Sequence, residues 1–170
     1  MTEECISCAT VSGSFLPPGG IVFDHPQWIV VLRKNPVRFP CLPLIILKRH
    51  VEDMAELNGE ESSSLGQVMQ STAQVLSRVL QPAKVHFGIY AEDVKHIHVH
   101  VFPRMPNMPP GNIPNLWIGH WIALLHALGL KQAYSDATVG EYARDLRHAY
   151  REFTSTQQVN GSAIAILAGR

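Results

Sequence analysis

The chain has 170 residues, of which 46% are hydrophobic and 16% charged, and these proportions fit one globular domain with a buried core. Fourteen Lys and Arg residues balance 14 Asp and Glu residues, so no net charge attracts nucleic acid or a membrane surface. The sequence shows no recognisable secretory signal and no apolar run of the ~20 residues needed to span a bilayer. Because three cysteines with one Cys-x-x-Cys pair indicate a reducing compartment, we expect a cytoplasmic protein with no membrane or nucleic-acid partner.

The first third of the chain carries the pattern of three short strands. Apolar, β-branched segments lie at Ile21–Asp24, Trp28–Arg33 and Leu44–Leu47, and a His-Pro break and an Asn-Pro turn interrupt the chain between them. The stretch Arg38–Pro43 contains two prolines, and we expect it to be irregular. Leu44–Leu47 is almost wholly apolar, which favours a central position in a sheet.

A helix and a fourth strand follow. Apolar residues in Leu65–Val79 recur at spacings of three and four, which predicts an amphipathic helix that ends at a Gln-Pro pair. Lys84–Tyr90 alternates apolar with other side chains and predicts a strand. Ala91–Val94 is short enough to form a hairpin turn to the next strand.

The stretch from His96 to Phe102 alternates three histidines with apolar residues. Alternation at period two predicts a half-buried β-strand, with His96, His98 and His100 on one face and the apolar side chains in the core. Such a face could hold a metal ion if further ligands were present. Alternatively, one imidazole could attack phosphorus while a neighbour exchanges a proton with the leaving group. The spacing alone leaves both interpretations open.

The remainder of the chain is predicted to be helical. Leu116–Leu130 is apolar almost all round, which indicates burial in the domain or in a subunit contact. Thr138–Glu141 matches a capping box and predicts the start of another helix. The apolar side of that helix comprises Val139, Tyr142, Leu146 and Tyr150. The tail of small residues from Ala163 to Gly169 is expected to fray.

The histidine stretch with its flank, His96–Arg104, resembles the signature of the histidine-triad (HIT) superfamily. Two further pieces resemble the family: a strand with a Lys-Arg-His run ending at His50, and the Cys5–Cys8 pair, which is similar to the amino-terminal zinc pair of many bacterial members. The resemblance implies an α+β fold with an antiparallel sheet of about five strands and a packed helix. We therefore expect a HIT domain over residues 1–115, with extra C-terminal helices over residues 116–170 packed on the same domain.

The resemblance also implies a chemistry. Family members are nucleotide hydrolases and transferases that act at an α-phosphate, and they are often dimeric. By position, His98 matches the nucleophile that forms a covalent nucleotidyl-histidine, and His100 matches the partner near the leaving group. The implied zinc ligands are Cys5, Cys8, His50 and His96. Four protein ligands close a tetrahedral coordination sphere, so this zinc would be structural and no catalytic metal is required.

The predicted nucleotide pocket departs from the family pattern at two places. Ala91 and Glu92 stand where many members carry Gly-Gln, and Arg33 stands about where a ribose-binding aspartate is often found. We predict that substrate contacts come from Arg33, Asn35, Glu92 and Arg104. The predicted substrates are dinucleoside polyphosphates or nucleoside phosphoramidates, and the predicted state is a homodimer.

Two alternative functions remain open at this point. The first is a non-catalytic nucleotide-binding or regulatory module on the HIT fold, which the altered residues Glu92 and Arg33 favour and the presence of all three histidines opposes. The second is a metalloenzyme that holds a catalytic metal with His96, His98 and His100.

Overall fold

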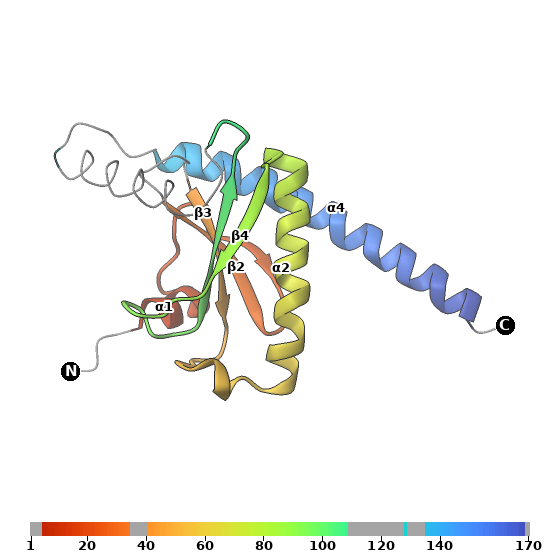
Figure 1. Cartoon of the computed structure of the whole chain (residues 1–170), viewed down its shortest axis with the longest axis horizontal. Helices are drawn as coiled ribbons and strands as arrows, with labels where there is room; N and C mark the ends of the chain where they lie inside the picture. The colour runs from red at the N-terminus through yellow and green to blue at the C-terminus, as the bar shows by residue number, and fades with distance from the viewer. Residues whose placement is uncertain (1–4, 35–40, 109–127, 129–134, 169–170) are drawn as a thin grey trace.

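The computed structural model describes residues 5–34, 41–108, 128 and 135–168, and its strands form one antiparallel sheet (Figure 1). The strands are β1 (Ile21–Asp24), β2 (Trp28–Lys34), β3 (Cys41–Leu47), β4 (Lys84–Gly88) and β5 (His98–Arg104). Their order across the sheet is β1-β2-β3-β5-β4, so the apolar β3 lies at the centre, as predicted. The α+β fold with a five-stranded antiparallel sheet is therefore confirmed.

Helices cover the sheet and are fixed to it by side-chain contacts. The described helical segments are α1 (Ile6–Ser12), the 3-10 helix η1 (Met54–Glu56), α2 (Gly59–Leu80) and α4 (Asp136–Ala168). At the start of α2, the Asn58 side chain accepts the Glu61 N–H and the Glu61 carboxylate accepts the Asn58 N–H, which forms a capping box. The same buried carboxylate accepts two hydrogen bonds from Arg49, at 2.7 and 2.8 Å. This pair ties the start of α2 to the segment that follows β3.

Side chains alternate along the strands between two covered faces. The larger core cluster lies beneath α2 and α4 and includes Trp28, Leu32, Ile45, Val99 and Val101. The smaller cluster comprises Ile29, Val31 and Ile46, with Val11 of α1 packed against it. Figure 1 shows α1 and α2 on opposite sides of the sheet. Because neighbouring residues of a strand face opposite ways, burial of Val99 and Val101 in the larger core turns His98 and His100 toward the α1 face.

β3 begins at Cys41, whereas the sequence predicts an irregular stretch through Pro43. Pro43 pairs in register with Leu32 of β2 and is buried. On its other side, β3 pairs with β5 only over Leu44–Ile46. Pro43 therefore lies where β3 is locally an edge, and a residue without an N–H donor is tolerated there.

β5 begins at His98, so the first histidine of the triad precedes the strand. The backbone of Ile97 pairs instead with the chain around the end of β3: its N–H donates to Val51 over 2.8 Å, and its carbonyl accepts from Leu47 at 3.3 Å. The connection from β4 to β5 is also longer than the hairpin turn that the sequence predicts. Tertiary pairing of Ile97 with the segment after β3 replaces the local hairpin.

α4 begins at Asp136, two residues before the predicted capping box at Thr138. The Ser135 hydroxyl accepts the Thr138 N–H and so supplies the cap from an earlier position. The apolar side of the helix packs in the larger core, as predicted. Its Tyr150 hydroxyl donates to Thr72 of α2 over 2.7 Å, which joins the two helices inside that core.

The C-terminal part of α4 extends beyond the sheet and remains helical to Ala168 (Figure 1). The sequence predicts fraying here, but the Ala and Leu residues near the end favour a helix. The predicted helix Leu116–Leu130, apart from an exposed residue 128, and the predicted boundary after residue 115 lie outside the described residues. Of the helices in the described ranges, none is long and apolar enough to cross a membrane.

Candidate active site and metal centre

Two of the three histidines lie on β5 with their rings in contact, and we refer to His98 and His100 as the histidine pair. Their Nε2 atoms are 3.1 Å apart. The Nδ1–H of His98 donates to the backbone carbonyl of His96 over 2.8 Å, because a carbonyl can only accept. Neutral His98 therefore carries its lone pair on Nε2, and the contact requires that His100 donate its Nε2–H.

The surroundings of His100 keep its ring uncharged at neutral pH. Burial, followed by the neighbouring His98 and Arg33 side chains, lowers the pKa of His100 to about 4. The rings of Tyr90 and Phe102 contact the imidazole, with centroids 5.7 and 5.8 Å away. At pH 7, His100 is thus a neutral hydrogen-bond donor, and a bound anion would raise its pKa.

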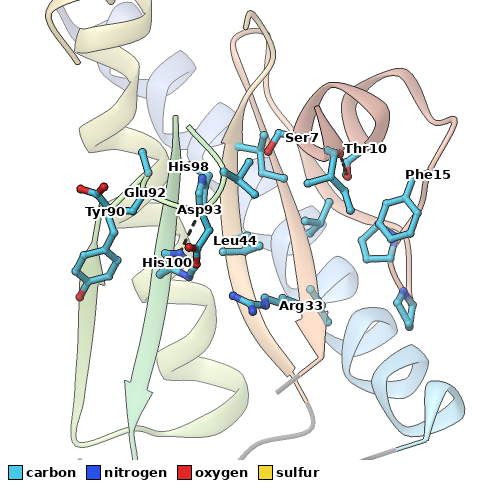
Figure 2. A pocket seen from close by; sticks show the side chains of 18 residues that line it. Ser7, Thr10, Phe15, Arg33, Leu44, Tyr90, Glu92, Asp93, His98 and His100 are labelled. Carbon is cyan, nitrogen blue, oxygen red and sulfur yellow. Dashed lines mark hydrogen bonds between the residues drawn. The ribbon is translucent and has the colours of Figure 1, made fainter. Parts of the chain in front are cut away.

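A cavity of about 720 Å³ opens over the histidine pair on the α1 face of the sheet. Figure 2 shows that its lining has three parts. At one end, the histidine pair lies beside Asp93 from the β4–β5 connection, and Glu92 lies further out, near Tyr90. At the other end, near α1, Phe15 lies beside Ser7 and Thr10. The lining also includes two prolines, and we refer to this largely apolar end as the apolar wall. Arg33 and Leu44 lie between these ends, so the cavity offers an acidic end, a cation and an apolar end in turn.

Four potential metal ligands gather next to the start of β5. They are Cys5, Cys8, His50 and His96, and their ligand atoms all lie within 4.8 Å of one another. The Sγ of Cys8 is 3.2 Å from Nδ1 of His50 and 3.4 Å from Nδ1 of His96, and the Sγ of Cys5 is 3.5 Å from the latter. A tetrahedral ion with usual zinc bond lengths sets neighbouring ligand atoms ~3.3–3.8 Å apart. The cluster therefore has the dimensions to hold one metal ion.

Hydrogen bonds outside the cluster orient its two imidazoles. The Nε2–H of His96 donates to the Leu47 carbonyl over 2.7 Å, which leaves Nδ1 to face the cysteines. Nε2 of His50 lies 3.4 Å from the Glu52 carboxylate. Burial lowers the pKa of His96 and raises the pKa of the Cys8 thiol. A bound cation would favour the Cys8 thiolate, so metal binding would release protons.

A model of the HIT domain matches residues 17–107, which is more than half of the chain. The chain belongs to the HIT domain family. The match confirms the sequence resemblance, and it includes the histidine pair, His50 and His96. The two cysteines of the metal cluster precede the matched residues. Among curated proteins, none matches this HIT protein.

Solved structures of HIT proteins have the same fold. A zinc-bound histidine triad family protein from Mycobacterium smegmatis is 21% identical, with a TM-score of 0.64, and the alignment covers 90% of this chain and 97% of that one. A hypothetical histidine triad nucleotide-binding protein from Sulfolobus tokodaii is 15% identical, with a TM-score of 0.64, and covers 87% of this chain and 93% of its own. At these identities the likeness establishes the fold alone.

The HIT domain places two of the four predicted substrate contacts in the cavity. Arg33 and Glu92 both line it. The Arg104 guanidinium donates to the Met108 carbonyl at 3.3 Å, and Arg104 is absent from the described lining of the cavity. Asn35 lies outside the described residues.

Other residues of the cavity belong to no motif that the sequence shows. Asp93 and Tyr90 flank the predicted Glu92 contact in the β4–β5 connection, and this proximity in sequence was the signal that could have found them. Phe15 belongs to a Gly-, Ser- and Pro-rich loop with no motif. Only the tertiary structure brings that loop to the same cavity as β5.

The turn before Glu92 keeps an unusual backbone conformation. Ala91 has φ +51°, in the left-handed region that favours glycine. The sequence resemblance aligns Ala91 with a glycine of many family members. Ala91 therefore adopts a left-handed conformation without the freedom of glycine, at a strain of roughly 1 kcal/mol.

Proposed function

We propose that this HIT protein is a nucleotide phosphohydrolase or nucleotidyl transferase that acts at an α-phosphate through a covalent nucleotidyl-histidine at His98. The observation that carries the proposal is the hydrogen bond from the His98 Nδ1–H to the His96 carbonyl, because it leaves Nε2 as the nucleophilic atom. That residue lines a cavity of about 720 Å³, a volume typical of small-molecule sites.

The proposed first step forms a bond from His98 Nε2 to the α-phosphorus and breaks the bond from phosphorus to the leaving group. Binding of the anionic substrate raises the pKa of His100, so that its imidazolium can give the Nε2 proton to the leaving atom. In the second step, water attacks the phosphorus, the N–P bond breaks, and its electron pair returns to His98. His100 takes the proton of the water, and a nucleoside monophosphate is released. Another acceptor in place of water gives transfer.

The acidic end of the cavity favours one of the two predicted substrate classes. Glu92 and Asp93 are exposed and line this end of the cavity, with Asp93 the nearer of the two to the histidine pair. Two carboxylates repel the anionic chain of a dinucleoside polyphosphate, whereas they can accept the N–H of a phosphoramidate and attract its amine as this leaves in protonated form. We therefore propose nucleoside phosphoramidates with amine leaving groups as the better substrates.

We also propose that the metal cluster holds one structural zinc ion. Thiolate and imidazole donors suit zinc, and four protein ligands leave no open coordination position for a substrate. His96 connects the two sites, since its ring faces the cysteines while its carbonyl orients His98. A catalytic metal held by all three triad histidines is disfavoured, because the His96 ring faces the cysteines and the histidine pair closes on itself.

A homodimer in the cytoplasm completes the proposal. The family resemblance supports the dimer. The small number of cysteines, two of them in a Cys-x-x-Cys pair, supports a reducing compartment such as the cytoplasm. Light scattering on the purified full chain tests the dimer, with a mass near twice 18.9 kDa expected.

The covalent mechanism is tested by intact-protein mass spectrometry after an acid-free quench. Wild type is mixed with adenosine, guanosine, cytidine and uridine 5′-phosphoramidates, beside His98→Ala and the exposed-histidine control His148→Ala. We expect wild type and the control to gain the mass of one nucleoside monophosphate and His98→Ala to gain none. Nucleotide binding with no adduct and no turnover would instead support the non-catalytic module.

A further inference from the structure

Arg33 is a cation on the cavity face of β2. Its exposed side chain lines the cavity together with the histidine pair. Within the described ranges of the chain, no carboxylate forms an ion pair with its guanidinium. The guanidinium is near enough to His100 to contribute to the lowered pKa of that imidazole. A positive charge in this position is available to a bound anion.

The strand register places Arg33 between the two ends of the cavity. Arg33 pairs with Leu42 of β3, and β3 separates β2 from the histidine pair on β5. Figure 2 shows Arg33 in the middle of the lining, with the histidine pair on one side and Phe15 on the other. A nucleotide that presents its α-phosphate to His98 and packs its base on the apolar wall would therefore bring its ribose to the part of the lining that holds Arg33.

A guanidinium suits an unmodified ribose less well than a carboxylate does. Each ribose hydroxyl can donate and accept, so a carboxylate takes both hydroxyl protons, whereas arginine can only donate to the hydroxyl oxygens and leaves those protons without an acceptor. The carboxylates in the described lining, Glu92 and Asp93, lie at the opposite end from the apolar wall. A phosphate on the ribose would instead place two acceptor oxygens and negative charge against the planar fork of Arg33. Dinucleotide-binding folds separate phosphorylated from unmodified ribose with the same exchange of an acid for an arginine.

We propose that Arg33 makes this site selective for nucleotides whose ribose carries a phosphate at the 2′ or 3′ position. This inference rests on the proposed reaction, because it takes the α-phosphate to lie at His98. Arg33 is then a specificity-determining residue, and the substrate class is a ribose-phosphorylated nucleotide with a second group attached to its 5′-phosphate.

Calorimetric titration of the purified full chain tests the selectivity. The ligands are the 5′-monophosphates of the four common nucleosides and their 2′,5′- and 3′,5′-bisphosphates. We expect one bisphosphate to bind wild type at least tenfold more tightly than its monophosphate, and which isomer binds identifies the phosphate position. In Arg33→Gln this ratio is expected to fall below twofold. Arg78→Gln, which changes an exposed arginine of α2 outside the cavity lining, is expected to keep the wild-type ratio.

Two results would overturn the assignment: equal binding of mono- and bisphosphates to wild type, or a preference that survives Arg33→Gln. Because Arg33 is exposed, the substitution leaves the core intact, and a thermal melt of each variant verifies this. Failure of the parent proposal has a different signature. If His98 forms the phosphoramidate adduct but the ribose phosphate does not tighten binding, only the role of Arg33 is rejected. If no nucleotide binds and no adduct forms, both the proposed reaction and the role of Arg33 are rejected.

Discussion

The Nε2–H of His96 donates to the Leu47 carbonyl over 2.7 Å, and this bond turns the other ring nitrogen toward Cys5 and Cys8. The backbone carbonyl of the same residue accepts the Nδ1–H of His98. One residue therefore belongs to the candidate metal cluster by its side chain and positions the candidate nucleophile by its backbone. We therefore expect that loss of a ligand from the cluster shifts His96 and, through its carbonyl, changes the orientation of the His98 ring.

Loss of one cysteine ligand is expected to remove the metal. Elemental mass spectrometry should find one zinc per chain in wild type and almost none in Cys8→Ser, because three ligands hold the ion much less tightly. The melting temperature of Cys8→Ser should fall by about 5 °C or more, since metal binding contributes to folding. Its kcat should fall roughly tenfold through displacement of His96.

His98→Ala serves as the control for the zinc content of Cys8→Ser. It removes a histidine of the same stretch that lies outside the cluster, so it should keep one zinc per chain while losing the covalent adduct. Retention of zinc in Cys8→Ser together with its loss in His98→Ala would contradict this assignment and place the metal at the triad.

Acid should destabilise the fold through His100. Its pKa in the folded protein is about 4, below the ordinary value of 6.5, so the unfolded chain takes up the proton first as the pH falls. The stabilising contribution is therefore complete above about pH 6.5 and is lost as the pH falls toward 4. Between pH 7 and 4.5, His100→Gln should lose about 2 kcal/mol less free energy of unfolding than wild type.

Urea denaturation at a series of pH values measures that difference. The exposed His148 offers a control, and His148→Gln should follow the wild-type curve in the same window. If the free energy of unfolding changes equally with pH in wild type and in His100→Gln, the surroundings of His100 do not hold its imidazole neutral.

The sequence predicts the sheet well because the strands carry local signals. Alternation around His98 and the apolar run ending at Leu47 are read from neighbouring residues alone, and both strands form where predicted. The exceptions depend on distant partners. Pro43 extends β3 because Leu32 pairs with it, and Ile97 leaves the predicted strand because it pairs with the chain beyond Leu47.

The candidate site divides in the same way. The ligand cluster was predictable because Cys5, Cys8 and the histidines each belong to a motif of the resembled family, and the fold brings them together. The apolar end of the cavity was not, because Phe15 contacts this space only after α1 and its following loop have folded onto the sheet. A loop rich in glycine and proline gives no periodic signal of its own.

Neutralising Glu92 should change the choice of leaving group. With Glu92→Gln, kcat/KM for a dinucleoside polyphosphate should rise about fivefold relative to that for a phosphoramidate, which corresponds to roughly 1 kcal/mol of screened repulsion. The change should shrink in 0.5 M salt, because screening already weakens the repulsion in wild type. Competition assays with both substrates measure the ratio, and Glu141→Gln, an exposed acid on α4, serves as the control. An unchanged ratio would show that the carboxylate does not face the leaving group.

A buried hydrogen bond between two hydroxyls joins α4 to α2, and neither residue lines the cavity over the histidine pair. The Tyr150 hydroxyl donates to Thr72, and burial raises the pKa of the phenol, so it stays protonated at all ordinary pH values. Tyr150→Phe keeps the ring stacked on Phe23, whose centroid lies 4.5 Å away, and removes only the hydrogen bond.

The free energy of unfolding of Tyr150→Phe should therefore fall by about 1 kcal/mol in urea denaturation, with kcat and KM unchanged. Thr72→Val should cost more, because it also leaves the Tyr150 hydroxyl buried without an acceptor. If the loss in free energy of unfolding of the double variant equals the sum of the two single losses, the two hydroxyls do not interact. The hydrogen bond would then contribute nothing to the contact between α2 and α4. A smaller combined loss is expected, because the second substitution removes a group whose partner is already gone.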